Sequence, residues 1–231
     1  TLPSPYSVGA TAWTAEHSSA LYASRGEAME ACAPIVNGAV KELAAIGVDE
    51  VQLDDTWLGD LPNPDFRKEE SIADLEEELD QYVRSVNAAF DGVEGVPLSV
   101  HVCGHTSPTT EGSDGWPYDR LFEALGRMNA GRFTLAMAGP NLEGFSTLRD
   151  FPSDKVLGLG VLRTVDHEIE TPDEIVRRVE RALEFVPAER VALNPDCGFS
   201  PSTRNRRDLD EVYARLKAMC RAAEILREKY G

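Results

Sequence analysis

The chain has 231 residues, and its 40 Asp and Glu against 23 Lys and Arg give a formal net charge of −17. Such an acidic chain repels phosphate backbones and anionic headgroups, which argues against nucleic-acid or membrane-surface binding. Hydrophobic residues make up 42% and charged residues 27%, as in globular proteins, and no apolar run approaches the length of a membrane span.

Short apolar runs predict six strands in chain order, over residues 6–10, 50–53, 98–102, 132–137, 156–162 and 190–193. Longer amphipathic patterns predict helices between them, over residues 25–46, 68–90, 118–128, 171–185 and 205–229. The helix after Thr171 has the clearest start, because a capping hydroxyl is followed by Pro172 and two acidic residues. Strand and helix alternate, so we predict parallel strands joined by right-handed crossovers.

Six such units suit either a doubly wound sheet or an incomplete (β/α)8 barrel. The reactive residue types decide between them: Asp54 with Asp55, His101 with Cys103, and Cys197 follow or end different predicted strands. Barrels gather catalytic groups from several strand ends on one face, whereas open sheets gather them at the switch point. We therefore predict an α/β fold of the (β/α)8 TIM-barrel type, as a single domain over residues 1–231.

A complete barrel has eight strands, two more than we count. We expect either an N-terminal segment of about 100 residues outside this sequence, judged from two or three βα units, or a degenerate barrel. Unpaired strand edges are a liability that proteins cover, so we also expect a homo-oligomer, a second chain that completes the barrel, or a different closure.

The four cysteines are too few for a disulfide scaffold, so we expect free thiols in a reducing, cytoplasmic setting. Cys32 and Cys220 stand in Ala-rich amphipathic stretches, where a thiol packs as a small apolar side chain. Cys103 and Cys197 each follow an apolar run and stand among polar and glycine residues, which indicates a chemical role.

His101 and Cys103 are one pleat repeat apart on a predicted strand, so both side chains face the same side. Imidazole nitrogen and thiolate sulfur are ligands that Zn²⁺ prefers. The pair alone is a weak signal, since most such pairs serve core packing. Cys197, at another strand end, completes a candidate three-ligand zinc site.

Three stretches together resemble the catalytic domain of cobalamin-independent methionine synthase. They are V-Q-L-D-D at 51–55, H-V-C at 101–103, and the segment 158–198, which runs from G-L-G-V to N-P-D-C-G. The wider superfamily includes zinc-dependent coenzyme M alkyltransferases and uroporphyrinogen decarboxylase, all on (β/α)8 barrels. The glycine pair of G-L-G-V lacks the third glycine of a dinucleotide site, so we interpret it as barrel packing.

The resemblance implies that Zn²⁺ is bound by His101, Cys103 and Cys197. It also implies transfer of a methyl group to a homocysteine-like thiol, which the metal holds as a reactive thiolate, from a folate-like or methyl-corrinoid donor. Asp54 matches the aspartate that binds the amino group of homocysteine, so it is our candidate for a catalytic and substrate-binding residue. Tyr6 is near the place of a donor-stacking aromatic residue.

Two positions depart from the family pattern. The family's glutamate ligand to zinc corresponds to Ala136, and only His105, Glu111 or Asp114 on a neighbouring loop offer a substitute. The family's proton-transferring histidine corresponds to Val165, with His167 two residues further on as the catalytic candidate. These departures leave open alkyl or epoxyalkane transfer to another thiol, such as coenzyme M, and a zinc- or thiol-binding module without catalysis.

Overall fold

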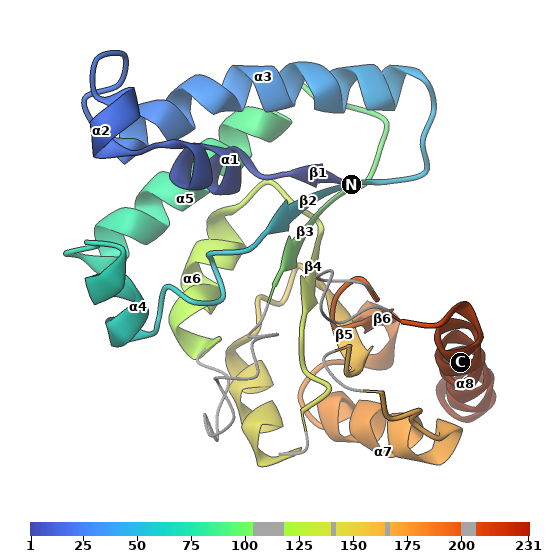
Figure 1. Ribbon diagram of the computed structural model, residues 1–231. Coiled ribbons are helices and arrows are strands. Elements are labelled where there is room, and N and C mark those ends of the chain that lie inside the picture. The colour runs from blue at the N-terminus through green and yellow to red at the C-terminus, as the bar shows by residue number, and fades with distance from the viewer. Residues whose placement is uncertain (104–117, 140–141, 165–166, 200–206) are drawn as a thin grey trace. The chain divides into compact units, whose positions relative to one another are not determined.

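The structure is a computed structural model, and it describes residues 1–103, 118–139, 142–164, 167–199 and 207–231 (Figure 1). These residues form six strands whose order in the sheet follows the order in the chain. The pairs β1–β2, β2–β3 and β5–β6 are parallel, as a strand–helix–strand sequence requires. The strands are β1 (Leu2–Pro3), β2 (Val51–Asp55), β3 (Leu98–Val102), β4 (Arg132–Leu135), β5 (Val156–Leu162) and β6 (Val191–Pro195).

Helices stand between these strands in the chain and after the last one. The α-helices are α1 (Pro5–Ala12), α2 (Ala15–Ser18), α3 (Arg25–Ala45), α4 (Pro64–Glu69), α5 (Leu75–Phe90), α6 (Asp119–Arg127), α7 (Pro172–Leu183) and α8 (Leu209–Tyr230). The 3-10 helices η2 (Leu142–Asp150) and η3 (Ala188–Arg190) precede β5 and β6. Among the described strands, β1 and β6 are the edge strands of the sheet, and the sheet does not close into a ring. An incomplete barrel is expected to have such an open sheet.

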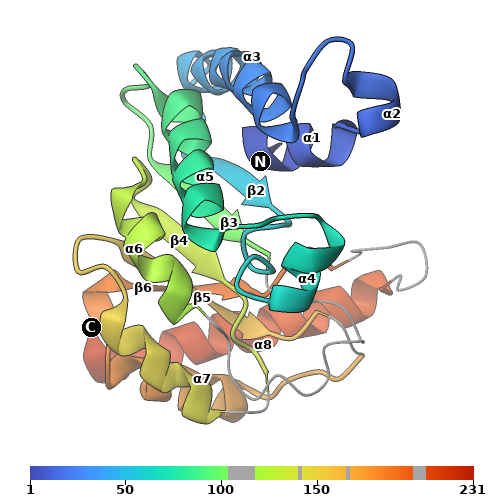
Figure 2. The ribbon, with the colours of Figure 1, turned by 90° about the vertical axis from the view of Figure 1, so that its left-hand side faces the viewer.

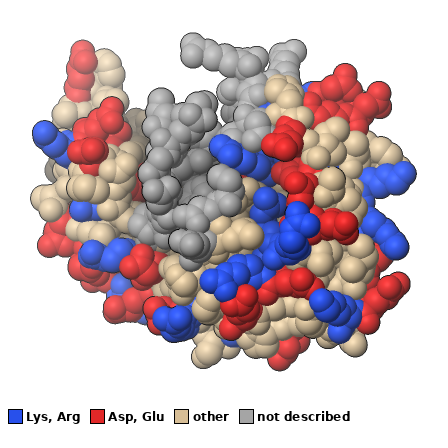
Figure 3. All heavy atoms as spheres, turned by 90° about the horizontal axis from the view of Figure 1, so that it is seen from below, with Lys and Arg blue, Asp and Glu red and all other residues tan. Residues whose placement is uncertain are grey.

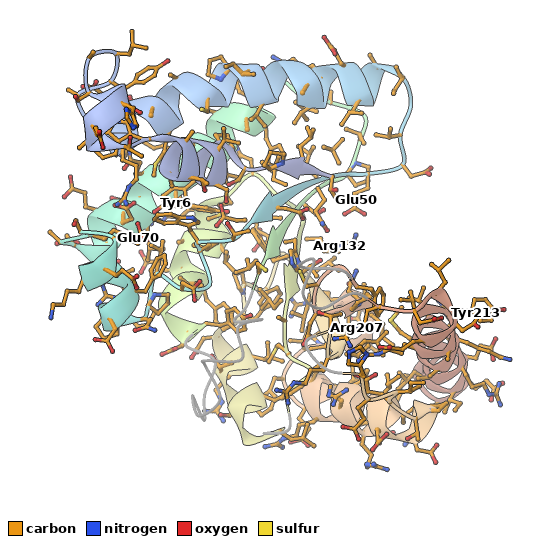
Figure 4. The ribbon with its side chains drawn as sticks, viewed as in Figure 1. Tyr6, Glu50, Glu70, Arg132, Arg207 and Tyr213 are labelled. Carbon is orange, nitrogen blue, oxygen red and sulfur yellow. The ribbon has the colours of Figure 1, made fainter. Side chains whose placement is uncertain are left out.

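The chain divides into two compact units. Unit 1 comprises Thr1–Val102 and Arg120–Phe133, and unit 2 comprises Cys103–Asp119 and Thr134–Gly231. In unit 1, α3 packs against α1 and α5 (Figure 2). Arg132 also binds both carboxylate oxygens of Glu50, at 2.6 and 2.7 Å, so β4 is tied to the residue before β2 (Figure 4). In unit 2, α7 packs against α8 and β5 pairs with β6.

Five of the predicted strands and the four helices over 25–46, 118–128, 171–185 and 205–229 lie where expected, within a few residues. Strands β3 and β5 have the predicted bounds. β5 is a continuous run of apolar residues and glycine, β3 has apolar residues at alternate positions, and both are buried almost throughout. Thr171 forms the full capping box with Glu174 at the start of α7.

Two predictions were wrong. Residues 6–10 form helix α1 rather than a strand, because the Ser4 side chain caps the Ser7 N–H and Pro5 occupies the first helical turn. The predicted helix over 68–90 is two helices, α4 and α5. The chain turns between them at Ser71, which has a positive φ of 59°, and Asp74 caps the second helix.

Acidic and basic side chains are mixed over the face that Figure 3 shows, so the net charge of −17 does not form one uniform field there. None of the helices in the described ranges is long and apolar enough to cross a membrane.

Candidate metal centre

The three predicted ligands come together at the end of β3 and after β6. One ligand atom each of His101, Cys103 and Cys197 lies within 4.8 Å of the others, and the two sulfur atoms are 3.8 Å apart. His101 is 7% exposed, and the thiols of both cysteines are half-buried. Because Cys103 and Cys197 are separated by 94 positions in the chain, the fold itself makes this cluster.

The donor set fits zinc. Tetrahedral Zn²⁺ has Zn–S bonds near 2.3 Å, which separate two sulfur ligands by about 3.8 Å, and the observed sulfur–sulfur distance is 3.8 Å. Nε2 of His101 is buried and has no hydrogen-bond partner among the described residues. Burial of such a nitrogen is unfavourable unless something binds it, and a metal ion would do so.

Asp196, next to Cys197, joins the ends of three strands in unit 2. Its Oδ1 atom accepts the backbone N–H groups of Met137 and Ala138, both at 3.0 Å, just after β4. Its own N–H donates to Leu162 O at the end of β5, at 2.9 Å. Burial raises the pKa of this carboxyl to about 7, against the lowering effect of the two N–H groups and of Arg178.

Glycines on β5 make room for the side chains of the neighbouring strands. A Cβ atom at Gly160 would lie 2.2 Å from Asp196 Oδ1 and 2.6 Å from Leu135 O, and one at Gly158 would lie 2.6 Å from Thr134 Oγ1. No side chain larger than hydrogen fits at Gly160 without a shift of backbone. The structure thus agrees with the interpretation of this glycine pair as packing, and Gly160 specifically accommodates Asp196.

The adjacent carboxylates on β2 have different surroundings. Asp54 stands in register with His101 of β3, so both side chains point to the same face of the sheet, and its carboxylate accepts from Gln52 Nε2 at 2.8 Å. Asp55 points the other way, is 0% exposed and accepts from Ser4 and Ser7 and from two backbone N–H groups. Burial raises the pKa of Asp55. Asp54 is therefore the carboxylate whose direction suits a role beside the candidate ligands.

Tyr6 lies in the core of unit 1 (Figure 4). Its ring packs at 5.1 Å from that of Tyr82 and at 6.2 Å from that of Trp57, and its hydroxyl donates to Glu78. Burial and the negative charge of Glu78 raise the pKa of the tyrosine. These contacts explain Tyr6 as a packing residue, and its predicted contact with a methyl donor stays a prediction.

His167 is exposed on the segment after β5, and its Nδ1 lies 2.8 Å from Glu211 of α8. Neither His167 nor Asp54 belongs to the three-residue cluster found among the described residues. Ala136 follows β4, is buried and has no ligand atom. The alternatives His105, Glu111 and Asp114, like Val165, lie outside the described residues.

The sequence did not indicate a buried ionic network between α8 and the segment after β5. Arg215 is 0% exposed and forms a two-point ion pair with Glu170, at 2.8 and 3.1 Å, while its Nη2 also donates to Arg163 O. Arg207, two residues before the same helix, donates to Thr164 O at 2.8 Å (Figure 4). The network ties Thr164 and Glu170, which stand on either side of His167 in the chain, to arginines at α8 and just before it. One signal was available, since Arg215 falls on the stripe that Ala222 and Leu226 bury.

The chain matches a family model described as cobalamin-independent synthase, catalytic domain, over residues 13–225. It is 27% identical over 208 residues to methionine synthase of Thermococcus kodakarensis, which covers 90% of this chain and 52% of the relative. It is 29% identical over 177 residues to the protein YxjG of Bacillus subtilis, covering 74% of this chain and 47% of that one. The chain thus spans about half the length of the curated relatives it matches.

Two solved structures are similar in fold. A B12-independent methionine synthase from Shewanella, solved in complex with selenomethionine, has a TM-score of 0.73 at 24% identity, over 90% of this chain and 57% of that one. A methyltransferase from Methanosarcina mazei has a TM-score of 0.52 at 18% identity, over 94% of this chain and 56% of that one.

Proposed function

The chain belongs to the family of the cobalamin-independent synthase catalytic domain, and from that premise we propose that it transfers a methyl group to the sulfur of a homocysteine-like thiol. The observation that carries the proposal is the cluster of one imidazole and two thiols with a sulfur–sulfur distance of 3.8 Å. Relatives whose names read methionine synthase support homocysteine as the acceptor.

Zinc is the cofactor we propose, held by His101 Nε2 and the sulfur atoms of Cys103 and Cys197. When bound, it would act as a Lewis acid that favours the thiolate form of the acceptor at neutral pH. The side chains keep the ligand set small, because Ala136 adds no donor. Three protein ligands are the number that catalytic zinc sites use when a fourth position serves the substrate.

Asp54 is our candidate for binding the amino group of the acceptor. Its position beside His101 in the sheet register supports this role, since a carboxylate there faces the same side as the proposed ligand. Its contact with Gln52 leaves the second carboxylate oxygen available for an ammonium group. His167 is the proton-transfer candidate, and its pairing with Glu211 would orient the ring.

The first experiment is a metal analysis of the purified protein with zinc supplied during growth. We expect about one zinc per chain in the unmodified protein, its loss in Cys197→Ser, and its retention in Cys220→Ser, which changes an exposed thiol of α8. Absence of zinc in the unmodified protein, with no uptake on titration, would overturn the proposed site, as would full zinc retention in Cys197→Ser.

The second experiment measures methionine formation from homocysteine with a methyl-folate or a methyl-corrinoid donor. We expect turnover with one of them, and a raised KM for homocysteine with unchanged zinc content in Asp54→Ala. Turnover with coenzyme M alone would move the acceptor to that thiol. Zinc binding without turnover on any thiol would replace the enzyme by a zinc- or thiol-binding module.

A further inference from the structure

A buried aspartate, Asp196, stands in the chain between the end of β6 and the candidate ligand Cys197. Asp196 is 6% exposed, and one of its oxygen atoms accepts from both Met137 N–H and Ala138 N–H at 3.0 Å. Cys197 is the next residue, and its sulfur lies 3.8 Å from that of Cys103. The position of one proposed ligand is therefore coupled to the end of β4, which offers no ligand of its own at Ala136.

The coupling is rigid because three strands take part. Besides the two bonds to the end of β4, the Asp196 N–H donates to Leu162 O of β5 at 2.9 Å. Gly160 of β5 leaves the space that the carboxylate fills, since a Cβ there would lie 2.2 Å from Oδ1. A side chain that receives two N–H groups in a pocket closed by backbone has little freedom to move. Because one peptide bond joins Cys197 to Asp196, the position of Cys197 is restrained as well.

We propose that Asp196 is a positioning residue of the metal centre, whose carboxylate holds Cys197 at the ligand distance from Cys103 by binding the backbone after β4. This inference rests on the proposed function, because it concerns the same three ligands. Groups that orient metal ligands commonly change metal affinity by about 10–100-fold when removed, so the effect is measurable without turnover.

Two substitutions separate position from charge. Asp196→Asn keeps a carbonyl oxygen that accepts both N–H groups, whereas Asp196→Ala removes the acceptor. We expect Asp196→Asn to bind Zn²⁺ within about threefold of the unmodified protein, and Asp196→Ala to bind it about 10–100-fold more weakly in competition with a chromogenic chelator. Loss of the tetrahedral Co²⁺ absorption bands in Asp196→Ala is the accompanying spectroscopic signature.

The matched control is Glu170→Ala, which removes another buried carboxylate of unit 2 from its ionic network. It should lower the Tm while leaving the Zn²⁺ affinity within about twofold, since the hydrogen bonds of Glu170 among the described residues go to Arg163 and Arg215 and not to Asp196 or Cys197. Equal loss of affinity in Glu170→Ala and Asp196→Ala would overturn the proposal, and so would unchanged affinity in Asp196→Ala. If Asp196→Ala does not fold, Asp196→Ser replaces it with the same expected outcomes.

A metal-free measurement distinguishes failure of this inference from failure of the proposed function. In protein carrying Cys32→Ser and Cys220→Ser, a dibromobimane reagent that fluoresces only after joining two neighbouring thiols should link Cys103 to Cys197. We expect Asp196→Ala to lower the yield severalfold although both thiols still react with a single-arm reagent. An unchanged yield refutes the positioning role, even if zinc never binds.

Discussion

The buried ion pair of Arg215 and Glu170 allows a sharp test of how unit 2 is held together. We consider Arg215→Met, which keeps most of the apolar volume and removes the guanidinium. In the native chain this group makes two bonds to Glu170, at 2.8 and 3.1 Å, and a third to Arg163 O, with no exposed surface. The substitution leaves a buried carboxylate without its cation and a backbone carbonyl without that donor.

Removing one partner of a buried pair costs about 3–5 kcal/mol, because the other charge stays desolvated. For a chain of 150–250 residues, 1 kcal/mol corresponds to roughly 2–4 °C in Tm. We therefore expect a Tm about 6–20 °C lower, followed by circular dichroism during heating. Urea unfolding gives the free energy directly.

The double variant Arg215→Met with Glu170→Gln tests the cause. Replacing the carboxylate by a neutral amide removes the uncompensated charge, so the double variant should be more stable than Arg215→Met alone. The two single losses should then exceed their combined effect, which is the mark of a coupled pair. A loss below about 1 kcal/mol in Arg215→Met, or strictly additive losses, would show that the pair behaves as a surface ion pair and would refute the reasoning.

Three further predictions concern single positions. Gly160→Ala should cost about 1–3 kcal/mol in urea unfolding because its Cβ would meet backbone, whereas Gly198→Ala, with nothing within 4 Å, should leave stability unchanged; equal losses would contradict this. Asp55→Ala should lower the free energy of unfolding by about 3 kcal/mol or more, because it leaves the backbone N–H groups of Trp57 and Leu58 without their acceptor. A variant as stable as the unmodified protein in the same assay would count against it. Hydrogen bonds from Thr171 lower the pKa of Glu174, so its contribution is present above the unfolded pKa of 4.5 and lost as the pH falls through the lower folded value. Glu174→Gln should therefore lower the Tm at pH 7 and much less at pH 3, and a loss independent of pH would refute it.

The strands could be predicted from the sequence where their signal is local. Strand β5 is a continuous run of apolar residues and glycine, as is typical of a parallel strand covered on both faces, and β3 has apolar residues at every second position. Helix α1 shows the opposite case. Residues 6–10 are apolar enough for a strand, and only the N-cap at Ser4 and the proline Pro5 indicate a helix. The turn after α4 depends on the positive φ of Ser71, a conformation that the presence of a serine in the sequence does not predict.

Part of the candidate site could likewise be predicted from the sequence, and part of it could not. The spacing of His101 and Cys103 fixes their common face, and Cys197 ends another strand, so their meeting follows from the parallel arrangement. The bonds from Asp196 to Met137 and Ala138 cross about 60 positions of sequence. They depend on how β4, β5 and β6 lie beside one another, which composition and periodicity do not determine.

Two buried aspartates perform the same structural task, one in each unit. Asp55 accepts the N–H groups of Trp57 and Leu58 with one oxygen, and Asp196 accepts those of Met137 and Ala138 with one oxygen. Burial raises the pKa of both carboxyls, so ionising them opposes folding unless these bonds compensate. Asp55 also accepts from Ser4 and Ser7 with its other oxygen, so it has little capacity left for a substrate. The less buried Asp54, with one side-chain contact and a place beside His101, is the acid that remains available for chemistry.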